Sequence, residues 1–366
     1  MQVMRLLVLG GTRFLGRATA SAAVTLGDQV ICAARGISGA VPAGATFVAI
    51  DREESNANAG ADAYAALADF GDFDAIIDVS NRPSQVRSAL AALGHRTHHW
   101  IYISSISAYA DNETPGQTAS TAPLLPPAAL DVDEADLANF GPCKVACEQA
   151  VLEVMGAERT FISRAGLIVG PEDPSGRFTY WPNRIARGGE ILAPGNRDDA
   201  VQWIDVRDLA DWLIDVAHRK VAGIFDGLCN PIGRADFLGG IARGVEALGV
   251  GNETPEFTWI TQDFLEEQQV NPWYGPRSLP LWTTVPEYGG LLSRDGGPAM
   301  DAGLACRDLA ETARSTLAWQ RDTTSAIDVS TSVGSAPVTP LRAGLTAEEE
   351  AEVLAAWHSA GGLRHR

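Results

Sequence analysis

Short apolar runs alternate with stretches of helical spacing along the first part of the chain. Residues 6–9 are all apolar, which is typical of a strand buried on both faces of a sheet. Residues 14–26 repeat their apolar positions with the period of a helix, and residues 29–34 are again mostly apolar. Glycines separate the first run from the helix. This alternation predicts a parallel sheet that is covered by helices on both faces.

The alternation continues to about residue 170. Further strands are predicted at residues 45–50, 74–80, 99–105 and 160–169, and helices at residues 57–67, 83–93 and 140–155. Beyond residue 170 the chain becomes rich in Trp, Pro and Gly. Residues 202–216 predict a short strand and an amphipathic helix, and residues 347–356 predict a terminal helix.

These elements predict an α/β protein in two parts. We expect residues 1–170 to form a Rossmann-type, doubly wound parallel sheet of the kind that binds a dinucleotide, and residues from about 200 to 230 to return to it. The remaining residues, 171–366, form a smaller C-terminal substrate-binding lobe. Ligands of such sheets bind at the carboxyl ends of the strands. We therefore expect a small-molecule substrate in a cleft between the sheet and the lobe.

Composition and charge narrow the class of protein. The chain has 366 residues, of which 46% are hydrophobic and 20% charged, as in globular proteins. The formal net charge of −18 argues against a nucleic-acid partner, because such binders carry basic surfaces. No apolar run approaches the roughly 18 residues of a membrane span. Residues 1–5 leave no room for a signal peptide before the first strand, which predicts a cytoplasmic protein.

The five cysteines do not form a metal-binding pattern. There is no Cys-x-x-Cys pair. Cys143 and Cys147 lie four residues apart in a predicted helix, but no further Cys or His lies nearby in the sequence to complete a metal site. We expect no metal and five reduced thiols.

The glycine turn after the first strand is the best candidate for cofactor binding. Dinucleotide-binding turns of this kind have the spacing Gly-x-x-Gly-x-x-Gly, and here Gly10 and Gly16 hold the outer positions. The turn brings backbone N–H groups and a helix N-terminus close to a pyrophosphate. Arg13 takes the middle position, so either its side chain bonds the nucleotide, which we favour, or the cofactor lies further away. The alternative is an ordinary strand–turn–helix with incidental glycines.

The residue after the second strand distinguishes NAD from NADP. An acid at this position receives the ribose 2′-hydroxyl of NAD, whereas an arginine can pair with the 2′-phosphate of NADP. Arg35 occupies this position, which favours NADP(H) over NAD(H), although a solvent-facing Arg35 is the alternative. The other predicted cofactor-binding residues lie in the turn or at strand ends, and they are Thr12, Phe14, Leu15, Asp51 and Ser80.

Several motifs together resemble those of a known family. They lie at residues 10–16, 102–109, 141–144, 164–171 and 202–209. In these motifs the chain resembles the extended short-chain dehydrogenase/reductases, a group of NAD(P)-dependent epimerases, dehydratases and reductases. The arginine in the glycine turn is similar to the atypical branch often described as isoflavone-reductase-like.

The resemblance implies a catalytic Ser, Tyr and Lys. Ser105 matches the Ser, and Lys144 matches the Lys, which in this family also bonds the nicotinamide ribose. Tyr and Lys are spaced four residues apart on one helix face, so that Lys lowers the Tyr pKa and Tyr exchanges a proton with the substrate. Phe140 stands at the Tyr position, and a phenyl ring cannot transfer a proton.

Three explanations of Phe140 remain open from the sequence. The chain is a variant made to trap a ligand, an enzyme whose proton comes from another residue, or a cofactor-binding protein without redox turnover. The candidate proton donors are Lys144, Ser105, Tyr109 and Tyr180. For Tyr109, packing over the cofactor or substrate is the alternative.

The loop after residue 170 supplies the expected substrate contacts, Arg177, Tyr180 and Trp181. These residue types suit an aromatic or carbonyl-rich ligand. The resemblance implies a reductase- or epimerase-like oxidoreductase that acts on a small carbonyl or enone. A non-redox isomerase or cyclase on the same fold is the alternative, and a homodimer is among the expected states.

Overall fold

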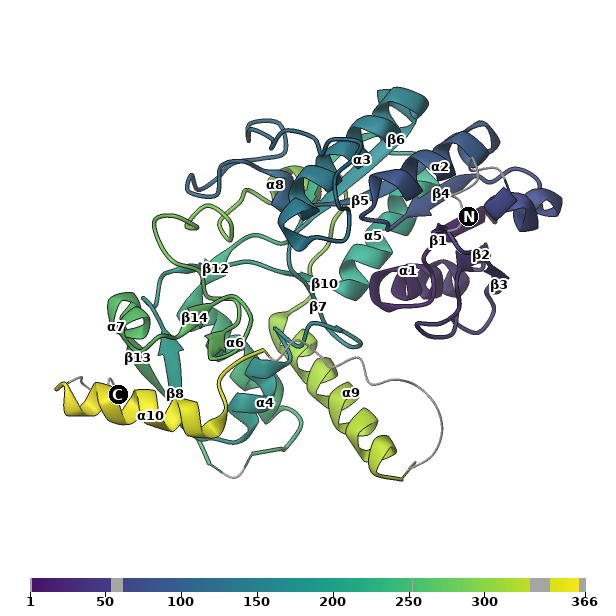
Figure 1. Ribbon diagram of the computed structural model, residues 1–366. Helices are drawn as coiled ribbons and strands as arrows, with labels where there is room; N and C mark the ends of the chain where they lie inside the picture. Colours follow the sequence, from purple (N-terminus) through teal and green to yellow (C-terminus); the bar gives the residue numbers. More distant parts are fainter. Residues whose placement is uncertain (1, 54–61, 252, 330–342, 362–366) are drawn as a thin grey trace. The chain divides into compact units, whose positions relative to one another are not determined.

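The computed structural model describes residues 2–53, 62–251, 253–329 and 343–361, and its contacts divide the chain into two compact units (Figure 1). The first unit comprises Met1–Leu167, Val206–Cys229 and Arg294–Cys306. The second unit comprises Ile168–Asp205, Asn230–Ser293 and Arg307–Arg366. The segment Arg294–Cys306, which the sequence places in the smaller lobe, therefore belongs to the first unit.

A seven-stranded sheet organises the first unit, and its order is β11-β6-β5-β4-β1-β2-β3. All neighbouring strands run parallel. The strands are β1 (Arg5–Leu9), β2 (Gln29–Ala34), β3 (Thr46–Ala49), β4 (Ala75–Asp78), β5 (Trp100–Ser105), β6 (Thr160–Ala165) and β11 (Gly223–Gly227). The order reverses beside β1, where doubly wound sheets bind their ligands. The predicted Rossmann-type fold is confirmed.

Helices cover both faces of this sheet (Figure 1). They are α1 (Phe14–Thr25), α2 (Pro83–Leu93), α3 (Phe140–Met155), α5 (Val206–Arg219) and the short α8 (Gly297–Asp301). Helices α2 and α3 pack together on one face, and α1 packs against α5. The predicted bounds of β2, α2 and α3 are confirmed to the residue.

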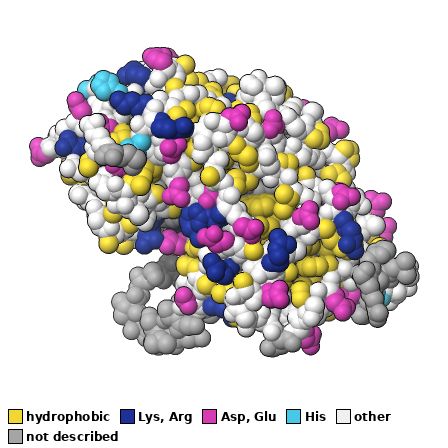
Figure 2. All heavy atoms as spheres, turned by 180° about the vertical axis from the view of Figure 1, so that it is seen from behind, with side chains coloured by type: hydrophobic (Ala, Val, Ile, Leu, Met, Phe, Trp, Pro, Cys, Tyr) yellow, Lys and Arg dark blue, Asp and Glu magenta, His cyan; other side chains and the backbone are white. Residues whose placement is uncertain are grey.

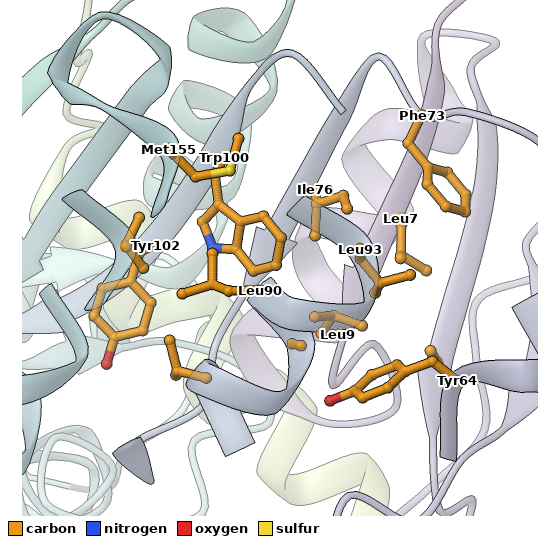
Figure 3. Close-up of a cluster of buried hydrophobic side chains, with 14 of the residues drawn as sticks. Leu7, Leu9, Tyr64, Phe73, Ile76, Leu90, Leu93, Trp100, Tyr102 and Met155 are labelled. Atoms are coloured by element: carbon orange, nitrogen blue, oxygen red, sulfur yellow. The ribbon is translucent and has the colours of Figure 1, made fainter. Parts of the chain in front are cut away.

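The core between the sheet and the pair α2–α3 is shown in Figure 3. Trp100 and Ile76 on the sheet are fully buried, and Leu90 of α2 and Met155 of α3 lie over them. Each large apolar side chain buried in this way contributes about 1.5–3 kcal/mol to the stability of the unit. The continuous apolar strands in the sequence follow from burial on both faces of the sheet.

Single-turn 3-10 helices connect some of these elements. They are η3 (Gly94–Arg96), η4 (Ile106–Ala108), η5 (Leu137–Asn139) and η6 (Ala157–Arg159). The helix expected at residues 57–67 lies partly outside the described residues. Its described part belongs to a longer 3-10 helix, η2 (Asp62–Phe70), in which Tyr64 and Leu67 are buried. A spacing of three residues puts both side chains on one side of a 3-10 helix.

The single strand expected at residues 160–169 is interrupted. Strand β6 ends at Ala165, and Gly166 N donates to Gly227 O 3.2 Å away. Strand β7 (Ile168–Val169) then pairs with β10 (Ile204–Asp205) in the second unit. The sequence of this segment does not show the change of partner, because residues on both sides of Gly166 are buried in one sheet or the other.

The expectation of five reduced thiols is wrong. Cys229 and Cys306 form a disulfide with a Cα–Cα distance of 6.0 Å, although they lie 77 residues apart. The disulfide fixes the end of Arg294–Cys306 to the chain beyond β11. Cys32, Cys143 and Cys147 are free and buried.

The second unit combines short strands with helices of different lengths (Figure 1). They are α4 (Tyr180–Ala186), β8 (Gly189–Pro194), β9 (Ala200–Val201), β12 (Ile232–Gly233), α6 (Arg234–Glu246), β13 (Pro255–Ile260), α7 (Gln262–Glu267), β14 (Asn271–Pro272), β15 (Ser278–Leu279), α9 (Leu309–Val329) and α10 (Ala347–Ser359), together with β7 and β10. The strand and helix expected at residues 202–216 are confirmed as β10 and α5, and the expected terminal helix is α10.

Charged side chains of both signs are scattered over the face drawn in Figure 2. On the face drawn in Figure 2, Lys and Arg side chains are interspersed with Asp and Glu side chains and form no continuous basic surface. None of the helices in the described ranges combines the length and apolar character that a membrane span requires.

Candidate functional site

A cavity of about 220 Å³ lies at the carboxyl ends of β1, β2 and β4 in the first unit. The predicted cofactor-binding residues that line it are Gly10, Thr12, Arg13, Arg35, Asp51 and Ser80. The fold thus brings together strand ends that lie up to 70 residues apart in the chain. A cavity in this position is where such a sheet binds a nucleotide.

The glycine turn has backbone and packing requirements that only glycine meets. Gly10 has a φ of 106°, and a Cβ there would lie 2.6 Å from Val79 Cγ2. A Cβ on Gly16 would lie 2.2 Å from Gly10 O. The first turn of α1 therefore packs directly on the loop, which is the close approach that the glycine spacing predicts.

Not every residue of the turn reaches the cavity. Phe14 begins α1 with a φ of 40°, and Leu15 is buried at 6% exposure. Neither of them, nor Gly16, lines the cavity. These three residues shape the turn, and any contact of theirs with a cofactor stays a prediction.

Two arginines predicted to bind the nucleotide line the same cavity. Arg13 precedes α1 in an extended conformation and is exposed. Arg35 follows β2 and is also exposed, with its Nη1 3.4 Å from Glu53 Oε1. Both cations are therefore available at the rim of the cavity.

The sequence analysis did not predict a buried ion pair beside the cavity, between Arg52 and Asp78. Arg52 makes two bonds to the carboxylate of Asp78, at 2.9 and 3.0 Å, and a third to Gln85 O at 2.9 Å. Arg52 and Gln85 line the cavity, and Asp78 also accepts from Ser80 N. In the sequence, Arg52 is visible only as an arginine shortly after a predicted strand. The fold shows that it pairs with Asp78, the last residue of β4.

Lys144 is buried one turn into α3. Its ammonium donates to Ser80 O at 3.0 Å and to Ile103 O at 2.7 Å. The Tyr102 ring lies 5.1 Å from Nζ. Burial lowers the pKa of Lys144 to about 8, because no carboxylate bonds the ammonium directly in the described structure. Lys144 does not line the cavity itself, but it is bonded to the backbone of Ser80, which does.

Phe140 and Ser105 lie at the same end of the sheet. The Phe140 ring centroid is 5.7 Å from Lys144 Nζ, and the ring is half-buried. A Cβ on Gly141 would lie 2.2 Å from Ser107 O, so the first turn of α3 packs closely on η4. Ser105 directly precedes η4, and its Oγ accepts from Ser107 N at 3.1 Å. The motif residues therefore come together around the start of α3.

Tyr109 is held in a buried network of charges. Its hydroxyl donates to Asp226 and accepts from Arg164 Nη1 at 3.2 Å. The Arg294 guanidinium lies 3.7 Å from the centre of its ring. Burial, together with the charge of Asp226, raises the pKa of Tyr109. We therefore withdraw the expectation that Tyr109 supplies a proton, because its hydroxyl is engaged and 2% of the residue is exposed.

The three expected substrate residues all lie in the second unit. Trp181 is buried at 1% exposure and donates from Nε1 to Pro280 O at 2.8 Å. It belongs to the core of that unit, so we withdraw its substrate contact. The Arg177 guanidinium lies 5.1 Å from the Trp273 ring, and Tyr180 lines a cavity of about 460 Å³ within the unit. Their contact with a substrate stays a prediction.

Potential metal ligands do not cluster in the described ranges. No group of three or more His, Cys, Asp or Glu side chains there could hold a metal ion.

A doubly wound parallel sheet with a glycine turn and a cavity at its strand ends defines a dinucleotide-binding α/β protein. A family model gives the narrower assignment. The chain belongs to the NAD dependent epimerase/dehydratase family, whose model matches residues 6–225. A search of curated proteins finds no match.

Solved structures share the fold at low sequence identity. WbmH of Bordetella bronchiseptica, solved with NAD⁺, is 16% identical with a TM-score of 0.56, and the match covers 88% of this chain and 99% of that one. A putative epimerase from Burkholderia cenocepacia is 21% identical with a TM-score of 0.57, covering 87% and 98%. The UDP-glucose 4-epimerase of Thermotoga maritima is 16% identical with a TM-score of 0.57, covering 88% and 100%.

Proposed function

We propose that this chain is a reductase- or epimerase-like oxidoreductase that uses NADP(H) in preference to NAD(H) and acts on a small carbonyl or enone. In this proposal Phe140 replaces the usual proton-transferring tyrosine. A cytoplasmic location and a homodimer, both expected from the sequence, are retained as parts of the proposal.

The main support for the proposal is the arrangement of Phe140 and two backbone carbonyls around the Lys144 ammonium. The ammonium has three N–H groups, and the two backbone acceptors bonded to it account for two. The Phe140 ring lies over it at 5.7 Å, where the family resemblance puts the tyrosine ring. A chain without the chemistry would have little reason to keep both Lys144 and Ser105.

The residues of the first unit suit a nicotinamide dinucleotide. The glycine turn, into which no Cβ fits, would hold the diphosphate through backbone N–H groups. Arg13 and Arg35 would hold the adenosine phosphate, and Asp51 and Ser80 line the same cavity. When bound, the nicotinamide supplies or accepts a hydride. The remaining N–H of Lys144 would bond the ribose.

The proton must come from a group other than Phe140. Ser105 is half-exposed, and its hydroxyl now donates to Ser107 Oγ at 3.2 Å, a bond that a substrate oxygen could replace. Lys144, with a pKa of about 8, is protonated at neutral pH and can release its proton without a large cost. We assign the acid role to this pair, with Ser105 in contact with the substrate oxygen and Lys144 as the source of the proton.

Restoring the tyrosine tests the proposal. We expect Phe140→Tyr to fold and to oxidise NADPH with a ketone or enone panel at a rate equal to or higher than the natural chain. Any gain should lie within the range of about 10²- to 10⁴-fold that a positioned acid supplies. The measurement is the loss of NADPH absorbance under substrate saturation, with Lys144→Ala in both backgrounds as the control.

The alternatives predict other outcomes in the same assay. The absence of a phenol hydroxyl at Phe140 favours a non-redox isomerase or cyclase as the second candidate. Such an enzyme would convert its substrate with no net change in the cofactor. If Phe140→Tyr abolishes an activity that the natural chain has, the site is adapted to phenylalanine and performs other chemistry. If neither protein turns over any substrate of the panel while both bind the cofactor, the oxidoreductase proposal fails in favour of a binding protein.

A further inference from the structure

Glu53 lies at the rim of the cofactor cavity and is shared by two arginines. Its Oε1 is 2.9 Å from Arg82 Nη1 and 3.4 Å from Arg35 Nη1. Arg35 follows β2, whereas Arg82 directly precedes α2. One carboxylate oxygen therefore joins two separate elements beside the cavity, and one of the two arginines is a cavity-lining residue.

The backbone at Glu53 is anchored, whereas its side chain is held, among the described residues, only by the two arginines and is open to water. Glu53 N donates to Asp51 Oδ1 at 2.9 Å, and the preceding Arg52 is fixed on Asp78 by two bonds. In contrast, 45% of the Glu53 side chain and 43% of the Arg35 side chain are exposed. The carboxylate is thus held near the rim while remaining free to turn into solvent.

We propose that Glu53 is a resident counter-ion of Arg35, one of the two arginines proposed to hold the NADP 2′-phosphate, and that Glu53 moves away from Arg35 when the phosphate binds. This inference deepens the proposed NADP preference and rests on it. A 2′-phosphate carries more charge than a carboxylate and can bond a guanidinium through two oxygens. An exposed ion pair such as Arg35–Glu53 contributes little by itself, so exchanging it costs little.

The inference gives Glu53 a role opposite to that of an acid that selects NAD. Such an acid accepts the ribose 2′-hydroxyl and strengthens NAD binding. As a counter-ion, Glu53 instead competes with the 2′-phosphate for Arg35. It sets how strongly the cavity discriminates between the two cofactors without contacting either.

Calorimetric titration of Glu53→Gln with NADP⁺ and NAD⁺ distinguishes these roles. We expect the NADP⁺ affinity to rise about three- to tenfold, because the competing charge is removed while the side-chain size is kept. The NAD⁺ affinity should stay within about twofold, since Arg35 has no phosphate to receive. The gain should shrink at high salt, where exposed charges are screened.

Glu113→Gln is the matched control. It removes the same charge from an exposed side chain in the loop after β5, which does not line the cavity. A similar gain in NADP⁺ affinity for Glu113→Gln would mean that net charge alone is responsible, and the inference would be wrong.

Other results separate this inference from the proposed function. If the natural chain binds NAD⁺ more tightly than NADP⁺, the proposed preference fails, whatever Glu53→Gln does. If the natural chain prefers NADP⁺ but Glu53→Gln leaves the ratio of the two affinities unchanged, only the counter-ion role fails. A loss of NAD⁺ affinity in Glu53→Gln would show that Glu53 accepts the ribose hydroxyl and would overturn the inference.

Discussion

Two clusters of arginine and carboxylate side chains in the first unit, one at the cavity rim and one around Tyr109, differ mainly in burial. At the cavity rim, the side chains of Arg35 and Glu53 are 43% and 45% exposed. In the network around Tyr109, Arg164 and Glu148 are each 3% exposed and meet at 2.7 Å. The residue types are the same, but water reaches only the first pair.

The difference in burial decides what each cluster can do. Separating a buried pair leaves a charge without compensation in a medium of low dielectric, so the buried network holds α3, β6, β11 and the segment Arg294–Cys306 in one arrangement. An exposed pair exchanges partners at little cost. Ligand recognition is therefore expected at the rim, and structural rigidity from the buried network.

Removing the central arginine of the buried network should have the largest effect. Arg164→Met leaves Glu148 buried without its cation and Tyr109 without a donor. We expect the free energy of unfolding to fall by about 3–5 kcal/mol. Urea denaturation followed by tryptophan fluorescence measures this change.

The rim supplies the matched control for that variant. Arg82→Met removes an exposed partner of Glu53 and should change the free energy of unfolding by less than about 1 kcal/mol. Equal losses for Arg164→Met and Arg82→Met would show that burial does not distinguish the two clusters.

Lys144 extends the comparison to a buried cation that bonds backbone carbonyls and not a carboxylate. Its pKa is about 8 in the folded protein, against about 10.4 in an unfolded chain. Below pH 8 both states are charged and the folded state carries the cost of burying the cation. Between these values the folded state loses its proton first, so the cost is relieved as the pH rises.

The expected outcome is a pH-dependent difference between the natural chain and Lys144→Met. From pH 7 to about 10.4, the difference in the free energy of unfolding should move in favour of the natural chain by up to about 3 kcal/mol. Denaturation of both proteins across this range cancels the titration of the other groups. If the difference in the free energy of unfolding does not change with pH, burial does not lower the pKa of Lys144 as described.

Elements with a strong local signal could be predicted from the sequence. The bounds of β2, α2 and α3 follow from apolar spacing and from Pro83 at the start of its helix. The break between β6 and β7 could not, because the strand partners that differ on its two sides lie elsewhere in the chain. The disulfide joins cysteines that are 77 residues apart, and no local sequence pattern predicts such a pair.

The candidate site was predictable to a similar extent. The glycine turn and Arg35 follow from fixed positions beside strands, and the cavity brings them together. The roles of Arg52 and Glu53 depend on partners from other strand ends, Asp78 and Arg82, which a single sequence does not reveal. The position of Tyr109 could be predicted from the sequence. The buried Arg164 that bonds its hydroxyl and the buried Arg294 that lies over its ring could not.

The most direct measurement is calorimetric titration of the natural chain and Arg35→Ala with NADP⁺ and NAD⁺. The central claim is that the rim arginines of a dinucleotide cavity select the 2′-phosphate. It predicts tighter binding of NADP⁺ by the natural chain and a loss of about five- to tenfold in that preference in Arg35→Ala, with NAD⁺ affinity nearly unchanged. Tenfold tighter binding of NAD⁺, or a preference for NADP⁺ that survives in Arg35→Ala, would contradict it.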